Sequence, residues 1–122
     1  MYRRLFIEAG LASEDFQMRV KMPVVLPKET GWGRHIYHLY QIRVQKRDEL
    51  MSFLKTHGVG TEVYYPVPLH LQACFKELGY QPGSLPNAER AAEETLALPI
   101  YPELSEEQMR KVFDTISAFF KA

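Results

Sequence analysis

The sequence predicts an α/β (α+β) domain in which a small three-stranded sheet, antiparallel or mixed, is covered by helices on one side. Three observations support this class. Residues 34–44 alternate at period two, residues 46–57 carry apolar side chains at helical spacing, and a stretch from Ser105 combines a capping box with a strong apolar stripe. The length of 122 residues suits one domain, with 46% hydrophobic and 25% charged residues.

The first part of the chain is predicted to contain a helix end and a loop. Residues 2–11 carry apolar Leu5 and Leu11, with Gly10 at a position suited to a helix C-cap. The stretch "KMPVVLPKETGWG", residues 21–33, places two prolines and two glycines around a short apolar run. We therefore expect residues 12–34 to form a loop with one brief extended piece.

The clearest predicted strand, "RHIYHLYQIRV", is followed by a predicted helix. One face of this strand is nearly all apolar and consists of Ile36, His38, Tyr40, Ile42 and Val44. Residues 46–57 then predict a helix whose buried stripe contains Leu50, Phe53 and Leu54. Gly58 follows where a helix commonly ends.

The second half of the chain is predicted to alternate short elements. "GTEVYY", residues 60–65, is a second strand that ends at Pro66, because proline cannot donate to a sheet ladder. After the Pro-Val-Pro corner we expect a short helix, and another helix that begins at Pro86. The apolar stripe of the short helix consists of Leu71, Cys74, Phe75 and Leu78. "LALPIY" is a third short strand before the capped C-terminal helix, where Gln108 completes the capping box.

Composition limits the classes of function. Fifteen basic and fifteen acidic side chains cancel, so no overall charge would attract nucleic acid or an anionic membrane. The single Cys74 excludes an internal disulfide and a cysteine-based zinc cluster. No apolar run approaches the roughly 20 residues of a membrane span, and Glu8 interrupts the apolar start that a signal peptide would need. We expect a soluble, cytoplasmic protein.

Two residue pairs resemble catalytic or metal-binding patterns. His35 and His38 lie three apart on the predicted strand, so their side chains point to opposite faces, which argues against a shared metal. His70 and Cys74 share one face of the predicted helix at the spacing of a base and a nucleophile. Cys74, however, lies on the apolar stripe, where a thiol usually packs as a small hydrophobe. A small enzyme that uses this pair ranks last among our hypotheses.

His38 allows two interpretations. On the apolar face of a strand, a neutral core histidine bonded to a tyrosine or a carbonyl is the simpler one. Alternatively, His38 lies at the strand edge and points into a cleft. No glycine-rich phosphate loop is present, and the glutamate pairs at 93–94 and 106–107 are interpreted as solvated helix positions.

Three segments in order resemble a known family. They are "HIYHLYQIRV", "RDELMSFLKTHGVGTEVYYPVPLHLQ" and "LPNAERAAEETLALPIYPELSEEQMRKV". Together they are similar to the C-terminal part of the DegT/DnrJ/StrS family of sugar aminotransferases, which use pyridoxal phosphate (PLP). The upstream "YRRLFIEAGL" resembles the end of the interdomain helix of that family. The resemblance therefore covers nearly the whole chain.

The resemblance implies a fold, a reaction and a site. Family members have the type I aspartate aminotransferase fold, with a large PLP-binding domain and a small C-terminal domain, and pair as dimers. They transfer an amino group to a nucleotide-linked keto-sugar in the synthesis of amino sugars for surface polysaccharides and related glycoconjugates. By resemblance, residues 1–34 are the end of the interdomain helix plus a loop, and residues 35–122 are the small lobe. The substrate-binding residues implied are His38, Tyr64 and His70, whereas Tyr65 is expected in the core.

The chain departs from the family because the large domain is missing. The seven lysines, residues 21, 28, 46, 55, 76, 111 and 121, match no part of the Schiff-base motif. PLP chemistry needs a lysine aldimine and a partner for the pyridine nitrogen, so we expect no catalytic or cofactor-binding residue here and no activity from this chain alone. We expect it to be either a piece of a longer polypeptide or a truncated gene product. A freestanding binding or regulatory module that docks onto an intact aminotransferase is the alternative hypothesis.

Overall fold

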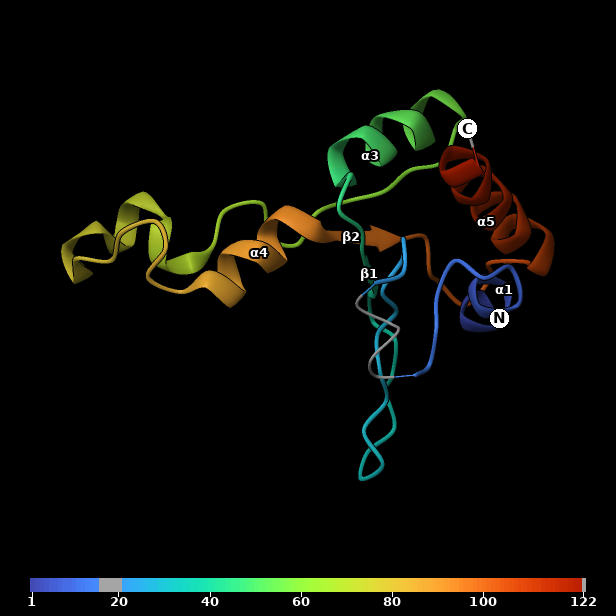
Figure 1. Ribbon diagram of the computed structural model, residues 1–122, viewed down its shortest axis with the longest axis horizontal. Coiled ribbons are helices and arrows are strands. Elements are labelled where there is room, and N and C mark those ends of the chain that lie inside the picture. The colour runs from blue at the N-terminus through green and yellow to red at the C-terminus, as the bar shows by residue number, and fades with distance from the viewer. Residues whose placement is uncertain (16–20, 122) are drawn as a thin grey trace.

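The computed structural model describes residues 1–15 and 21–121, and its elements follow one another in an α+β order. A short helix precedes the first strand, a second helix and a run of short helical turns follow, and a second strand leads into a long C-terminal helix (Figure 1). The elements are α1 (Tyr2–Glu8), β1 (Tyr40–Arg43), α3 (Arg47–Thr56), η1 (Leu69–Leu71), η2 (Ala73–Leu78), α4 (Pro86–Glu94), β2 (Thr95–Leu98) and α5 (Glu106–Lys121).

The sheet has two strands rather than the predicted three. β1 and β2 pair antiparallel, from Tyr40 opposite Leu98 to Arg43 opposite Thr95. Residues 60–65, predicted as a strand, contribute a single bridge between Glu62 and Ala97. The ladder stops there because the Val63 N–H donates to the carboxylate of Glu62, 3.0 Å away, and the prolines that follow have no N–H to donate.

The strand predicted over residues 34–44 is also shorter than expected. Tyr37 has a φ of 52°, in the left-handed region, and its N–H donates to His35 Nδ1 at 2.8 Å. This local turn breaks the extended backbone before β1 begins. Ile36 is therefore 84% exposed, while the later members of the predicted face (Tyr40, Ile42 and Val44) are buried. Residues 27–38 form a loop that projects from the sheet (Figure 1).

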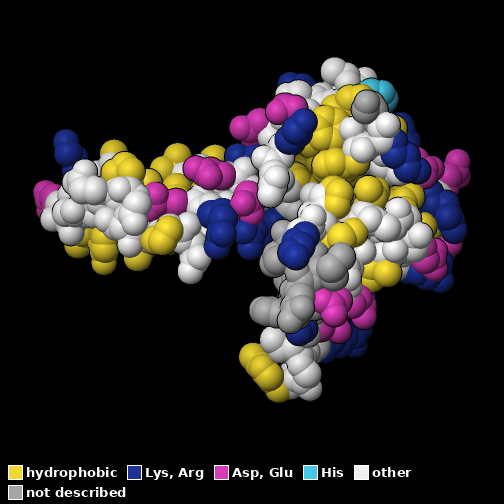
Figure 2. All heavy atoms as spheres, in the orientation of Figure 1, with side chains coloured by type: hydrophobic (Ala, Val, Ile, Leu, Met, Phe, Trp, Pro, Cys, Tyr) yellow, Lys and Arg dark blue, Asp and Glu magenta, His cyan; other side chains and the backbone are white. Residues whose placement is uncertain are grey.

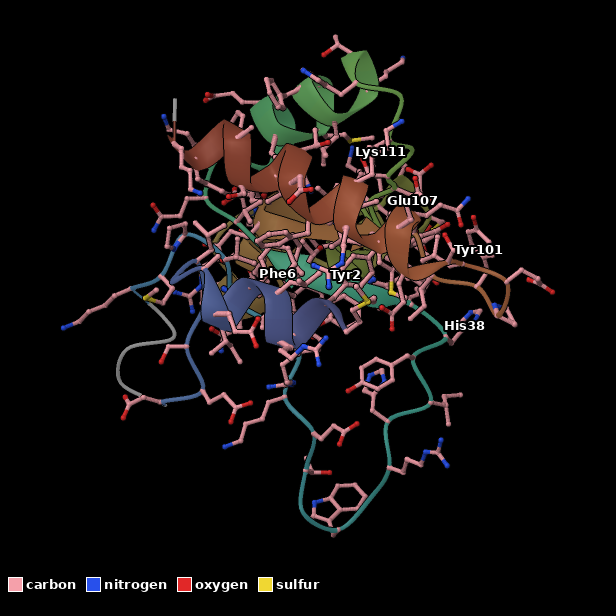
Figure 3. The ribbon with its side chains drawn as sticks, turned by 90° about the vertical axis from the view of Figure 1, so that its right-hand side faces the viewer. Tyr2, Phe6, His38, Tyr101, Glu107 and Lys111 are labelled. Carbon is pink, nitrogen blue, oxygen red and sulfur yellow. The ribbon has the colours of Figure 1, made fainter. Side chains whose placement is uncertain are left out.

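The hydrophobic core lies between the sheet and the helices α1, α3 and α5, which gather on one side of the sheet (Figure 1). α1 lies against this core, with Tyr2 and Phe6 on its inner side (Figure 3). The Phe6 ring meets Phe113 of α5 edge-on at 5.3 Å. The predicted helices of residues 46–57 and of the C-terminus are confirmed. The capping box is also present. The Ser105 N–H donates to Gln108 Oε1, and the Gln108 N–H donates to Ser105 Oγ.

Residues 66–94 form an arm that leaves the sheet on the side away from these helices (Figure 1). The arm contains η1, η2 and α4. The single helix predicted over residues 71–78 is wrong, because Gln72 is extended (φ −71°, ψ 144°) and separates η1 from η2. The predicted buried stripe is also wrong: Leu71 is half-buried, and Cys74, Phe75 and Leu78 are exposed. These side chains do not contribute to the hydrophobic core, which lies between the sheet and the helices α1, α3 and α5.

Two arginines fasten the arm to the rest of the molecule. The Arg47 side chain, 8% exposed as a residue, donates to the carbonyls of Ala92 and Thr95 at 2.9 Å each. The Nε of Arg43 donates to Glu94 Oε2 at 3.0 Å. Glu94 was predicted to be a solvated helix position, but its carboxylate is an ion-pair partner at the end of α4. The base of the arm is therefore held by polar contacts on both sides.

Candidate functional site

An open groove of about 320 Å³ lies where β1 begins and β2 ends. We call it the His38 groove. It is lined by His38, Leu39, Tyr64 and residues 60–62 and 97–100. The fold thus brings together two of the three substrate-binding residues implied by the resemblance, one from the end of the projecting loop and one from the segment before the arm.

His38 lies on the segment that leads from the projecting loop into β1, on the same side of the molecule as Tyr101 (Figure 3). Its side chain is exposed, so the interpretation as a neutral core histidine is wrong. The cause is the turn at Tyr37, which ends the predicted apolar face before it reaches His38. His38 also lines a neighbouring groove of about 440 Å³, which runs past His35 toward Arg43.

Tyr64 is 42% exposed in the His38 groove, and its backbone is held from two directions. The neighbouring Glu62 pairs with Ala97 of β2, with N–O distances of 2.8 and 3.3 Å. From β1, the Gln41 side chain donates from Nε2 to the Tyr64 carbonyl at 3.3 Å. Tyr65 was expected in the core, but it is 68% exposed, because the chain leaves the sheet at this point.

His70, the third implied substrate-binding residue, lies elsewhere. It is buried inside the arm, with Nε2 3.1 Å from Glu89 Oε1 and its ring 5.8 Å from that of Tyr80. It does not line the His38 groove. The predicted His70–Cys74 face is wrong as well, since the two residues belong to separate turns and Cys74 is exposed.

Glu89 organises the arm, and the sequence reasoning missed it. Its carboxylate accepts hydrogen bonds from the N–H of Gly83 at 2.7 Å and of Leu85 at 3.1 Å, and it also contacts His70. The bond from Gly83, followed by those from Leu85 and His70, holds the pKa of Glu89 below its usual value. A signal was available, because an acidic residue in the first turn of a helix that starts at Pro86 is placed to cap it.

The chain offers little for a metal ion or for PLP. Within residues 1–15 and 21–121, no three histidine, cysteine or acidic side chains are grouped to hold a metal. The argument that His35 and His38 diverge does not hold, since neither lies on a strand and both line the neighbouring groove. All seven lysines are exposed, and no aspartate or glutamate is among the buried residues of the described ranges. These residues do not fit a PLP aldimine site.

None of the helices in the described part of the chain is long and apolar enough to cross a lipid bilayer.

Comparisons with known proteins place most of the chain in one family. The profile described as "DegT/DnrJ/EryC1/StrS aminotransferase family" matches residues 4–117. The chain is 54% identical over 98 residues to the "Pleiotropic regulatory protein" of Geobacillus stearothermophilus, covering 80% of this chain and 26% of that protein. It is 41% identical over 109 residues to a dTDP-3-amino-3,4,6-trideoxy-alpha-D-glucose transaminase of Streptomyces venezuelae, covering 88% and 29%.

Solved structures of aminotransferases have the same fold as this chain. The crystal structure of S. venezuelae DesV with a ketimine intermediate superposes with a TM-score of 0.81 at 32% identity. The match covers 99% of this chain and 31% of the DesV chain. This chain therefore spans less than a third of the length of the relatives described here.

Proposed function

This chain belongs to the DegT/DnrJ/EryC1/StrS aminotransferase family, and we propose that it forms the small C-terminal lobe of an aminotransferase for nucleotide-linked keto-sugars. The observation that carries the proposal is the family match over residues 4–117 together with the short coverage of the relatives. The names of relatives supply the substrate class, since the Streptomyces protein is a transaminase of a dTDP-linked sugar. We also propose the division into residues 1–34 and 35–122, dimer formation, a cytoplasmic location and a role in amino-sugar synthesis.

The lobe contributes one wall of the substrate site. The His38 imidazole and the Tyr64 hydroxyl lie in one open groove, where each can exchange hydrogen bonds with sugar hydroxyls. Gln41 and the Glu62–Ala97 bridge hold Tyr64 at this wall. His70 enters the proposal as a residue that supports the wall through the arm, because it contacts Glu89 instead of the groove.

The PLP chemistry is assigned to the larger domain. Solved relatives include PLP and PMP forms, and the cofactor supplies the electron sink for amino transfer. Since the residues of this chain do not fit the cofactor, we expect the chain alone to give no aldimine absorbance with PLP and no transaminase activity.

A chimera tests the proposal. In it, this chain replaces the matching C-terminal segment of the S. venezuelae transaminase, and amino transfer to the dTDP-keto-sugar is assayed. We expect an active chimera, in which His38→Phe with Tyr64→Phe raises KM at least about 10-fold and changes kcat less, because two substrate hydrogen bonds are lost. Tyr65→Phe is the matched control, since Tyr65 does not line the groove. An unchanged KM in the double variant would remove His38 and Tyr64 from the site.

The exposed arm also favours a second candidate, a freestanding module that docks onto an intact aminotransferase. Sedimentation of this chain mixed with the intact S. venezuelae enzyme separates the two. The lobe proposal predicts no complex, because the enzyme already carries its own lobe, whereas the module would co-sediment.

A further inference from the structure

The projecting loop of residues 27–38 exposes apolar side chains more fully than any other part of the described chain. Trp32 is 89% exposed and Ile36 is 84% exposed, the two largest values among the large hydrophobic residues of the described ranges. Figure 2 shows hydrophobic side chains at the end of this loop. Removing such side chains from water is favourable, so the end of the loop is suited to contact with an apolar surface.

Contacts at the base of the loop hold it in a defined shape. The Arg3 side chain donates to the Pro27 carbonyl, and the Tyr37 hydroxyl donates to Glu29 Oε1 at 2.8 Å. The Tyr37 ring also stacks on the ring of Tyr40, 5.6 Å away, at the start of β1. Because both ends of the loop are already tied to the body, its binding to a surface costs less ordering entropy than that of a free segment.

The shape of the loop places Trp32 where a flat surface can reach it. The Gly33 N–H donates to the Thr30 carbonyl at 3.2 Å and closes a turn that contains Trp32. In Figures 1 and 3 the loop extends downward, away from α3 and α5, and its tip is the lowest point of the molecule. A flat surface that approaches from this side therefore meets the turn before it meets the helices.

The charge beside the tip indicates which kind of surface fits. The lysine, arginine and acidic residues of the loop are Lys28, Glu29 and Arg34, and all three are exposed. The chain as a whole carries no net charge, so any attraction to an anionic surface is local to this loop. Tryptophan side chains lie at the headgroup level of bilayers, and each nearby lysine or arginine adds attraction to anionic lipids.

We propose that the projecting loop binds the surface of an anionic lipid bilayer. Trp32 and Ile36 enter the interfacial region, and Lys28 and Arg34 contact the lipid phosphates. Two apolar side chains and two cations supply far less affinity than a spanning helix, so the binding is reversible and peripheral. The proposal does not depend on the function proposed above. An apolar protein surface, including a second copy of this chain, is the competing occupant.

Trp32 is the single tryptophan of the chain, so its fluorescence reports on the loop directly. The chain is titrated with vesicles of phosphatidylglycerol and, in parallel, with vesicles of phosphatidylcholine. We expect the emission to move to shorter wavelength with phosphatidylglycerol. The partition coefficient should be at least about 5-fold higher than with phosphatidylcholine, as two cations less one carboxylate predict. Added salt should reduce this preference, because it screens exposed charges.

Matched variants separate the two contributions. Lys28→Gln with Arg34→Gln should abolish the preference for phosphatidylglycerol, whereas Arg90→Gln, at an exposed cation of the arm, should leave it. Trp32→Ser removes the fluorophore, so its binding is measured by co-sedimentation with vesicles and should fall at least about 10-fold. Tyr101→Ser, at a tyrosine that is 48% exposed outside the loop, should bind as before. Since all five side chains are exposed, the Tm should not change.

Three results would overturn the proposal. The first is an emission that does not respond to vesicles, or equal partition into both lipids. The second is an emission that shifts with protein concentration in the absence of lipid, together with a dimer in sedimentation, which assigns the tip to a second copy. The third is an isolated chain that binds vesicles while the chimera does not, since the tip would then be covered in an assembled enzyme. Binding of both, lost with Trp32→Ser, supports the proposal.

Discussion

The body of the molecule and the arm of residues 66–94 are stabilised in different ways. The body is formed by α1, β1, α3, β2 and α5. The body buries apolar faces of five elements against one another, so its structure is set by packing. The arm contributes no residue to that core, and hydrogen bonds to Glu89 and from two arginines hold it. Apolar residues at regular spacing therefore predict that a face is buried, but they do not predict which part of a protein buries it.

The largest expected difference between the body and the arm is in the free energy of unfolding lost when a leucine is truncated. Leu54→Ala in the body should lower the free energy of unfolding by about 2–5 kcal/mol, because Leu54 is fully buried. Leu78→Ala in the arm should change it by less than about 0.5 kcal/mol in the isolated chain. Urea unfolding of both variants measures this. Similar losses would mean that the arm has packing of its own.

Arg47 tests whether the junction is held as strongly as the core. Arg47→Met leaves the carbonyls of Ala92 and Thr95 without their donor, and buried acceptors left unpaired cost about 1–3 kcal/mol each. We expect a loss of about 2–4 kcal/mol in urea unfolding. Arg90→Met is the control, since Arg90 is exposed and contacts only Asn87 in the described hydrogen bonds. Equal effects of the two variants would contradict a structural role for Arg47.

Glu89 should make the arm more sensitive to acid than the body. Its pKa is lowered in the folded chain, first by the bond from Gly83, so its contribution is present above the unfolded pKa and is lost as pH falls through the folded one. The amide resonance of Gly83 should therefore titrate with a midpoint below 4.5, the ordinary pKa of a glutamate side chain. Glu89→Gln should abolish this titration and Glu93→Gln should leave it. A midpoint at or above the ordinary value would contradict the assignment.

The smallest effect separates two tyrosines of the body. The Tyr40 hydroxyl is buried without a hydrogen-bond partner among the described residues, and burial raises its pKa to about 12. The Tyr2 hydroxyl donates to the Pro99 carbonyl at 3.1 Å. We expect Tyr2→Phe to cost about 1 kcal/mol and Tyr40→Phe to be neutral or slightly stabilising. Thermal unfolding compares them, and a larger loss for Tyr40→Phe would reveal a partner for its hydroxyl.

The helices could be predicted where local signals and the core agree. The Ser105–Gln108 box, Pro86 at the start of α4 and Gly58 after α3 mark helix ends within a few residues of where they lie. The strands were overextended because period two persists through residues 34–39 and 60–65, whereas the backbone turns at Tyr37 and leaves the sheet before Pro66.

The candidate site was predictable only in part. The family resemblance singled out His38 and Tyr64, which do share a groove, and it also singled out His70, which does not reach it. Arg47 was missed because its partners lie 45 and 48 residues away; the first-turn position of Glu89 was a local signal, but its contact with His70, 19 residues away, had none. No local pattern encodes contacts at such separations.

The Arg47 junction gives the arm a mechanical property. α4 has nine residues and is thus about 13 Å long, and both Arg47 and Arg43 hold it at its C-terminal end. A tilt of about 10° at that end would swing the far end of the helix by roughly 2 Å. A change of orientation at the base of the arm would therefore displace its tip more than its base.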